Sequence, residues 1–569
     1  MNEFDLVIRG GTIVDGSGGE PFVGDLAVKD GRIASIGRFV GAGVEEIDAT
    51  GRIVTPGFVD PHTHYDGQAV WSETLSPSSS HGVTSVVIGN CGVGFAPCRQ
   101  EDHAALINVM EGVEDIPGVV MTEGLPWTWE TFPEYLDTLE RGRRDIDVAA
   151  FLPHSPLRVY AMGARGANRE PANDDDLARM RALAKEAIEA GAIGFATSRL
   201  LIHKTADGQA IPSFDADVRE LKEITGGMAD AGSGTFQVVP DLFRGMAAEL
   251  DVVAQVAESC GRPATVTLGT PNEGARNWEG AIARMEQANA AGAKITAQVL
   301  PRPIGLIAGL ELSIHPFVLC PSYAPLAKLP LAERVARMRE PALRAALLAE
   351  TPDEGHPLAG LARNFKWMFP LKGKPDYAPP LSDSVAAQAA ARGISPEEFA
   401  LDWLTDGDGR NMLYVALGNY YQGNFDVLRE LLQRPDCIVG LGDGGAHYGA
   451  ICDASYPTFV LTHWVRDAKQ GEGFGLAQAV NMLSHKAALA VGLGDRGLLA
   501  LGYKADINVI DLAGMNLPLP HIEHDLPAGG RRLNQLAKGY DATIVSGAVI
   551  RRFDRDTGAR PGKLVRGAR

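Results

Sequence analysis

Two patterns of hydrophobic and polar residues divide the chain. Near both ends the two kinds alternate with a period of two, as in FDLVIRGGTIVDG (4–16) and RGLLALGYKADINVID (496–511). Glycine-containing pairs mark the bends, which is typical of half-buried strands joined by tight turns. We therefore expect a small β-sandwich domain formed by both termini, residues 1–56 and 493–569.

Residues 57–492 instead alternate apolar runs with amphipathic segments. The segment 174–190, for example, begins with the acidic DDD, carries apolar residues at helical spacing and ends at Gly191. Such alternation indicates parallel strands joined by crossover helices. Eight apolar runs occur, at 53–64, 84–92, 147–154, 191–199, 234–240, 263–270, 293–301 and 437–445. The pattern predicts the α/β class, as a distorted (β/α)8 TIM barrel whose active site lies at the carboxyl ends of the strands.

The segment 302–436 separates the seventh run from the eighth. It is far too long for a simple crossover, and it is rich in proline in places, as in PLKGKPDYAPPLSD (370–383). We expect it to form an inserted subdomain or lid on the barrel.

The composition and the net charge restrict the classes of protein and of partner that the sequence allows. The 569 residues carry a formal net charge of −18, which would repel nucleic acid and anionic membranes. No apolar stretch is long enough to span a bilayer, and the first residues lack the regions of a signal peptide. Six cysteines in so long a chain do not make a disulfide framework. We expect a cytoplasmic protein with a small-molecule partner and no nucleic-acid or membrane partner; the sequence leaves a homo-oligomer open.

The first apolar run ends in GFVDPHTHYDGQ (57–68), which carries two histidines one residue apart. Side chains at i and i+2 of a strand share a face, so His62 and His64 should point the same way. Two parallel imidazoles are half of a tetrahedral zinc site. An isolated pair of this kind is equally consistent with two histidines that are hydrogen-bonded in a turn. The residues at the other strand ends are needed to distinguish the two interpretations.

Further polar residues close the later runs, and the barrel geometry would gather them at one end. The second run supplies Cys91, and the eighth supplies Asp443. Two imidazoles, a thiolate and a carboxylate form a reasonable zinc site, because coordination keeps a thiol deprotonated. The remaining candidates at the strand ends are Asn90, His154, residues 197–199, Gln237, Thr267 and Gln298.

With these residues in place, the chain resembles the amidohydrolase superfamily, and within it the N-acyl-D-amino-acid deacylase (D-aminoacylase) group. The resemblance is carried by the HxH motif, by SSSHGVTSVVIGNCGVGFAP (78–97) and by the aspartate of the eighth run, and it extends over nearly the whole chain. It implies that His62, His64, Cys91 and Asp443 are metal ligands. It also implies that Asp443 is the general base for a metal-activated water that attacks an amide.

The chain also departs from that family. Gln237 and Thr267 stand where the family supplies histidines from strands five and six, and Ala454 stands near the place of an arginine that holds the substrate carboxylate. We therefore expect a divalent metal, zinc first, as one ion on the four ligands or as two ions, with His203 able to fill the gap. Substrate-binding candidates are His154, Arg199, His203, Gln237 and Arg302.

Three functions remain in competition at this level. The leading prediction is a metal-dependent hydrolase that cleaves a non-peptide C–N bond in an N-acyl-D-amino acid or a similar amide. A cyclic-amide or lactam hydrolase would use the same activated water. A binding protein that has lost catalysis would explain the missing histidines, but it has no chemical need to retain all four ligands.

Overall fold

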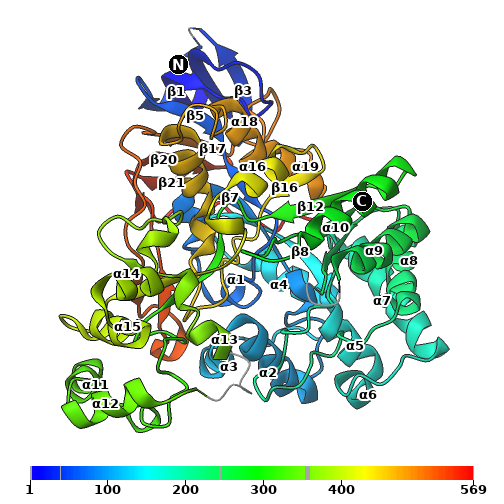
Figure 1. Cartoon of the computed structure of the whole chain (residues 1–569). Coiled ribbons are helices and arrows are strands. Elements are labelled where there is room, and N and C mark those ends of the chain that lie inside the picture. The colour runs from blue at the N-terminus through cyan, green and yellow to red at the C-terminus, as the bar shows by residue number, and fades with distance from the viewer. Residues whose placement is uncertain (1–2, 39, 242–244, 353–358, 568–569) are drawn as a thin grey trace.

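Both ends of the chain contribute strands to a single nine-stranded sheet. The computed structural model describes residues 3–38, 40–241, 245–352 and 359–567. The strand order is β22-β21-β20-β17-β5-β1-β2-β3, and β4 pairs with β1. The strands are β1 (Phe4–Ile13), β2 (Phe22–Lys29), β3 (Arg32–Gly37), β4 (Gly43–Asp48), β5 (Ile53–Pro56), β17 (Ile507–Ile510), β20 (Tyr540–Val545), β21 (Ala548–Arg552) and β22 (Arg555–Asp556). Figure 1 shows the blue and the orange-to-red strands side by side.

The contact that joins the two ends is the antiparallel pair of β5 and β17, in which Ile53 faces Ile510. Alternate residues of the strands are buried in a shared core, which contains Leu6 and Ile8 from one end and Ile507 and Val509 from the other. Members of this core are two residues apart, as the period-two pattern predicts, although the intervening Val7 and Asn508 are buried as well. The sheet formed by both termini is thus confirmed, whereas the domain boundaries at residues 56 and 493 stay a prediction.

Eight parallel strands form the predicted barrel, in the order β6-β7-β8-β9-β10-β11-β12-β16. They are β6 (Phe58–Asp60), β7 (Val83–Ile88), β8 (Asp147–Pro153), β9 (Gly194–Ser198), β10 (Thr235–Val239), β11 (Ala264–Thr267), β12 (Ile295–Val299) and β16 (Cys437–Val439). The (β/α)8 expectation is therefore confirmed. The first run is not one strand, however, because residues 53–56 belong to the terminal sheet.

The division falls at Gly57. A Cβ atom there would lie 2.2 Å from Oγ1 of Thr84, so the chain passes too close to β7 for any side chain. The amide of Gly57 donates to the carbonyl oxygen of Asp506 at 2.8 Å, which ties the bend to the terminal sheet. A bend fixed in this way starts the barrel strand at Phe58.

The seam between the first and last barrel strands is joined just beyond their ends. The amide of Asp443 donates to the carbonyl oxygen of His62 at 3.2 Å, and the amide of His64 donates to that of Gly444 at 2.8 Å. The first and last strands of the nearly closed barrel are therefore linked through the segments that carry three of the four expected ligands.

Helices cover the outside of the barrel, on the right of Figure 1. A capping box of Asn173 and Asp176 begins α7, and Gly191 in the left-handed region ends it, so the predicted range 174–190 is confirmed. The major outer helices are α7 (Asp174–Ala190), α8 (Val218–Ala231), α9 (Met246–Cys260) and α10 (Asn277–Ala290). The other elements are α1 (Gln68–Trp71), α2 (His103–Glu114), α3 (Gly118–Gly124), α4 (Phe132–Arg141), α5 (His154–Met162), α6 (Ala164–Ala167), α16 (Asp426–Gln433), α17 (Tyr456–Phe459), α18 (Leu476–Asn481), α19 (Ala487–Ala490), β18 (His521–Glu523) and β19 (Arg532–Asn534).

The segment 302–436 has its own sheet and core, as expected of an insertion. Its strands pair in the order β13-β15-β14. A separate cluster that includes Phe317, Met338, Phe399 and Leu404 is buried there. The elements that form this sheet and core are β13 (Ile304–Ala308), β14 (Met368–Leu371), β15 (Met412–Gly418), α11 (Leu331–Met338), α12 (Pro341–Ala349), α13 (Ala359–Ala362), α14 (Val385–Arg392) and α15 (Pro396–Thr405). Across the described residues, no helix has the length and apolar character that crossing a bilayer requires.

Candidate metal centre

Four side chains from three strand ends converge at the carboxyl end of the barrel. Sγ of Cys91 lies 3.4 Å from Nε2 of His62 and 3.7 Å from Nε2 of His64. Oδ1 of Asp443 lies 3.6 Å and 3.7 Å from the same two nitrogens. The structure thus brings together the residues that the sequence singled out. His62, His64 and Cys91 form a group whose donor atoms lie close enough to share one metal ion.

Local backbone geometry places the thiol of Cys91 in this cluster. Cys91 lies in a short 3-10 turn, Asn90–Gly92, that follows β7, and it adopts a left-handed conformation with φ of 56°. Gly92 lies against β9, because a Cβ atom there would be 2.7 Å from Cα of Thr197. The strained turn, packed into the end of the barrel, holds the sulfur beside the two imidazoles.

The imidazole of His62 is oriented by an amide. Its Nδ1 lies 3.1 Å from Oε1 of Gln298, whose Nε2 donates to Oγ1 of Thr265 at 3.2 Å. Because Gln298 presents its oxygen to His62, the Nδ1–H group of the ring donates and Nε2 keeps its lone pair. That lone pair faces Cys91 and Asp443, which is the arrangement of a metal-binding histidine.

His64 has a second neighbour that the sequence did not reveal, the carboxyl group of Glu114. Nδ1 of His64 lies 3.3 Å from Oε1 of Glu114, and Oε2 of Glu114 lies 3.5 Å from Nε2 of His447. Glu114 is the last residue of α2 and is buried on the same face as Met110. An acidic residue on the apolar stripe of a helix is the one indication that the sequence offered.

Burial sets the protonation of the cluster. It lowers the pKa of His62 to about 4 and holds that of His64 well below its usual value, where His62 and His447 lower it further. Burial raises the pKa of the Cys91 thiol and of the Asp443 carboxyl, in the latter case with the nearby Asp453 and Asp60. Neutral imidazoles are the form that binds metals, and a divalent cation would stabilise both anions.

The donor set therefore fits a divalent metal ion. Two imidazole nitrogens, one sulfur and one carboxylate oxygen are ligands that zinc accepts in tetrahedral sites. The Asp443 side chain retains 21% exposure, while His62 and His64 are almost fully buried. The carboxylate is thus the donor that a substrate can approach.

The positions expected to depart from the family pattern face the inside of the barrel. Gln237 on β10 is in register with Thr265, and Thr267 on β11 is in register with Gln298. Both amide atoms of Gln237 and Oγ1 of Thr267 are buried without a hydrogen-bond partner in the described chain. These polar groups remain available to water or to substrate.

Three other candidates have internal partners instead, and one of them, Arg302, pairs with Asp453 at 2.7 Å. His154 uses both ring nitrogens, with Thr197 and Glu220 at 2.8 Å each. Arg199 forms a forked pair with Glu249, whose shorter contact is 2.7 Å. The structure therefore places His154 and Arg199 in the supporting framework, outside the cluster of donors.

Two further histidines lie beside the cluster. Nδ1 of His203 is 2.8 Å from Oγ of Ser198, and both His203 and His447 are close enough to lower the pKa of His64. The ring of His203 is not part of the group of three donor residues, and its role as a substrate contact stays a prediction.

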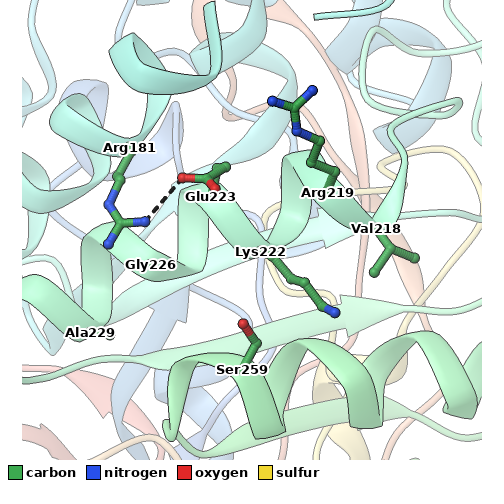
Figure 2. A pocket seen from close by; sticks show the side chains of 8 residues that line it. All are labelled: Arg181, Val218, Arg219, Lys222, Glu223, Gly226, Ala229 and Ser259. Atoms are coloured by element: carbon green, nitrogen blue, oxygen red, sulfur yellow. Dashed lines mark hydrogen bonds and ion pairs between the residues drawn. The ribbon is translucent and has the colours of Figure 1, made fainter. Parts of the chain in front are cut away.

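A separate hollow lies among the outer helices, as Figure 2 shows. It is lined by residues of α7, α8 and α9, among them Lys222 and Ser259, and Arg181 pairs with Glu223 beside it at 3.0 Å. None of its lining residues belongs to the cluster. Because barrel enzymes use the carboxyl ends of their strands, the cluster is the candidate active site.

An eight-stranded barrel with imidazole, thiolate and carboxylate donors at its carboxyl end defines a metal-dependent hydrolase. The chain belongs to the amidohydrolase family, whose model matches residues 45–551. It is accordingly a hydrolase of carbon–nitrogen bonds other than peptide bonds. The resemblance found in the sequence motifs is confirmed.

Individual relatives span nearly the whole chain. A D-aminoacylase of Alcaligenes xylosoxydans xylosoxydans is 26% identical over 581 residues, which cover 99% of this chain and 97% of that protein. An N-acyl-D-glutamate deacylase of the same organism is 29% identical over 519 residues, covering 90% and 88%. The solved structure of N-acyl-D-glutamate deacylase from Bordetella bronchiseptica, complexed with zinc and a phosphonate inhibitor, has a TM-score of 0.65 at 23% identity over all of both chains. The fold of this chain is that of these deacylases.

Proposed function

We propose that the protein is a deacylase-like amide hydrolase that holds one zinc ion on His62, His64, Cys91 and Asp443. The observation that carries the proposal is the convergence of the Asp443 carboxylate on both Nε2 atoms, at 3.6 and 3.7 Å. The three remaining donors are buried, so they hold the ion, while the more exposed Asp443 also reaches the reacting atoms. A divalent ion bound there supplies Lewis-acid activation of water and of the scissile carbonyl.

Asp443 moves the proton in this reaction. Its carboxylate accepts a proton from the attacking water and then delivers it to the nitrogen of the leaving amine. Gln298 holds the imidazole of His62 with Nε2 toward the reaction centre, so that this donor needs little rearrangement. The amide carbon–nitrogen bond breaks as the nitrogen gains its proton.

The substrate is an N-acyl-D-amino acid or a related amide. Supporting this choice, relatives that align over most of the chain are a D-aminoacylase and an N-acyl-D-glutamate deacylase. The unpaired amide of Gln237 offers a donor and an acceptor that could pair with an amide group of the substrate. All six cysteines are free and buried, which supports a cytoplasmic setting.

A hydrolysis panel tests the proposed function. Zinc-loaded protein would be incubated with N-acyl-D- and N-acyl-L-amino acids, with their amides and with cyclic amides, and the released amine or acid would be quantified. We expect turnover of at least one open-chain amide that stops on zinc removal and is restored by zinc. Hydrolysis of cyclic amides alone would assign the protein to the competing lactam-hydrolase function, and turnover that survives zinc removal would contradict the metal centre.

A further inference from the structure

We propose that Glu114 is a positioning residue that sets the geometry of the metal centre through His64 and His447. This inference rests on the proposed metal centre, but it concerns a residue outside the four proposed ligands. Glu114 is 1% exposed and lies between the two histidines, one on either oxygen of its carboxyl group. Carboxyl groups are rarely buried so completely unless they are paired.

The contact with His64 is selective for one ring orientation. Nδ1 of His64 and Oε1 of Glu114 lie 3.3 Å apart, and within the described chain both are buried without a hydrogen-bond partner elsewhere. Closing this contact would satisfy two costly buried groups at once. It would also fix the hydrogen on Nδ1, so that Nε2 remains free to bind the ion.

The contact with His447 extends the same carboxyl group to the loop that carries the proposed base. His447 lies four residues after Asp443 in the same loop, and its amide donates to the carbonyl oxygen of Glu114. Nε2 of His447 lies 3.5 Å from Oε2 of Glu114. Backbone and side chain of one residue therefore hold the Asp443 loop against the imidazole of His64.

The next residue, Asp115, anchors this arrangement from outside. Its carboxylate accepts hydrogen bonds from Oγ of Ser313 at 2.8 Å and from the amide of Gly449 at 3.1 Å. Asp115 thus binds the same loop and the insertion, but neither of these two partners is a histidine of the cluster. Asp115 is a matched control, because it is an acidic residue at the same end of the helix that lacks the contacts of Glu114 with His64 and His447.

The test compares Glu114→Gln, Glu114→Leu and Asp115→Asn by zinc affinity, measured by competition with a chelator of known affinity. We expect zinc affinity to fall about 10- to 100-fold in Glu114→Gln and further in Glu114→Leu, while Asp115→Asn stays within about threefold of wild type. Absorption spectra of the cobalt-loaded proteins should change in the Glu114 variants alone, because the ligand field at His64 changes.

A second measurement separates positioning from a merely structural role. The melting temperature of the metal-free protein should be unchanged or higher in Glu114→Leu, because a buried carboxyl group is replaced by an apolar one. If Glu114→Gln does not fold, Glu114→Asp takes its place with the same expected loss. Zinc affinity within about threefold of wild type, with an unchanged cobalt spectrum, would overturn the proposal. This readout requires no turnover, so it fails or succeeds separately from the proposed amide hydrolysis.

Discussion

Arg302 and Asp453 form an almost fully buried ion pair beside the candidate metal centre. Nη2 of Arg302 lies 2.7 Å from Oδ1 of Asp453, and both side chains are almost inaccessible. The guanidinium also donates to Oγ of Ser455 and to the carbonyl oxygen of Cys452, both at 2.9 Å. Cζ of Arg302 lies 4.2 Å from the centroid of the Tyr377 ring. Four of the five N–H groups of Arg302 are therefore engaged within the protein.

This pair leads to a prediction about substrate charge. An α-carboxylate in a site that excludes water needs a cation, most effectively a forked arginine. Arg302 and Arg199 are both committed to internal carboxylates, and Ala454 offers no charge. We expect a higher kcat/KM for the amide of N-acetyl-D-methionine, or for a larger neutral amide, than for the free acid.

Steady-state kinetics with the acid and its amide side by side check this expectation. Lys204 is the cation that could reverse it, since it adjoins His203 in the sequence. A preference for the free acid, at kcat/KM of about 10⁴ M⁻¹s⁻¹ or more, would contradict the prediction. Loss of that preference in Lys204→Met would then assign the carboxylate clamp to Lys204.

Asp443→Asn should keep the fold and lose most turnover. The asparagine side chain has the same size but accepts no proton, and removing a general base costs about 10²- to 10⁴-fold in rate. The readout is kcat on the best substrate of the panel, with circular dichroism as the folding check. Asp453→Asn is not a neutral control, because it breaks the pair with Arg302. A kcat within a few-fold of wild type in Asp443→Asn would assign the base to another residue.

Cys91→Ser should reduce bound zinc, while Cys98→Ser should not. Both cysteines are buried, but Sγ of Cys98 contacts the carbonyl oxygen of Arg99, whereas Sγ of Cys91 lies between the two imidazoles. Elemental analysis after dialysis should find about one zinc per wild-type chain, as a site with four protein ligands requires. Equal zinc content in all three proteins would show that Cys91 is not a ligand.

His81 should make stability depend on pH below neutrality. Its Nε2–H donates to the carbonyl oxygen of Gln535 and its Nδ1 accepts from Thr458, each at 2.7 Å, and burial lowers its pKa to about 3. A lowered histidine pKa gives stability that is complete above pH 6.5 and is lost as the pH falls toward 3. Relative to His81→Gln, the unfolding free energy of wild type should fall by about 2 kcal/mol between pH 7 and pH 5.

Urea denaturation at each pH measures this difference. His521→Gln is the control of opposite sign, because the hydrogen bond to Glu523 raises the pKa of His521. That histidine contributes stability below pH 6.5 that is lost as the pH rises. Parallel pH profiles for wild type and His81→Gln would show that His81 is not titrated on unfolding.

The sequence predicted most of the architecture because the fold follows from periodicity. The range of α7 and the eight strand positions depend on local patterns of burial, and these were correct except at the first run. The prediction for that run was wrong at Gly57, where the division between two sheets depends on the close approach of Thr84 from another strand. No local pattern contains such a contact.

The site was predictable to the extent that its residues end strands. His62, His64, Cys91 and Asp443 do so, and the barrel gathers them without further information. Glu114 ends a helix, so its contact with His64 depends on how α2 packs. The pairing of Arg302 could not be predicted for the same reason, since its partner begins a short 3-10 helix, Asp453–Ser455, after β16.

The closure of the barrel through residues 62–64 and 443–444 has a consequence for how the protein folds during its synthesis. Synthesis proceeds from the amino end, so three proposed ligands leave the ribosome long before Asp443 does. Contacts between such distant segments also form late in folding, because they close a long loop. We therefore expect a nascent chain that carries His62, His64 and Cys91 to bind a cation before the last barrel strand supplies the proposed base, Asp443.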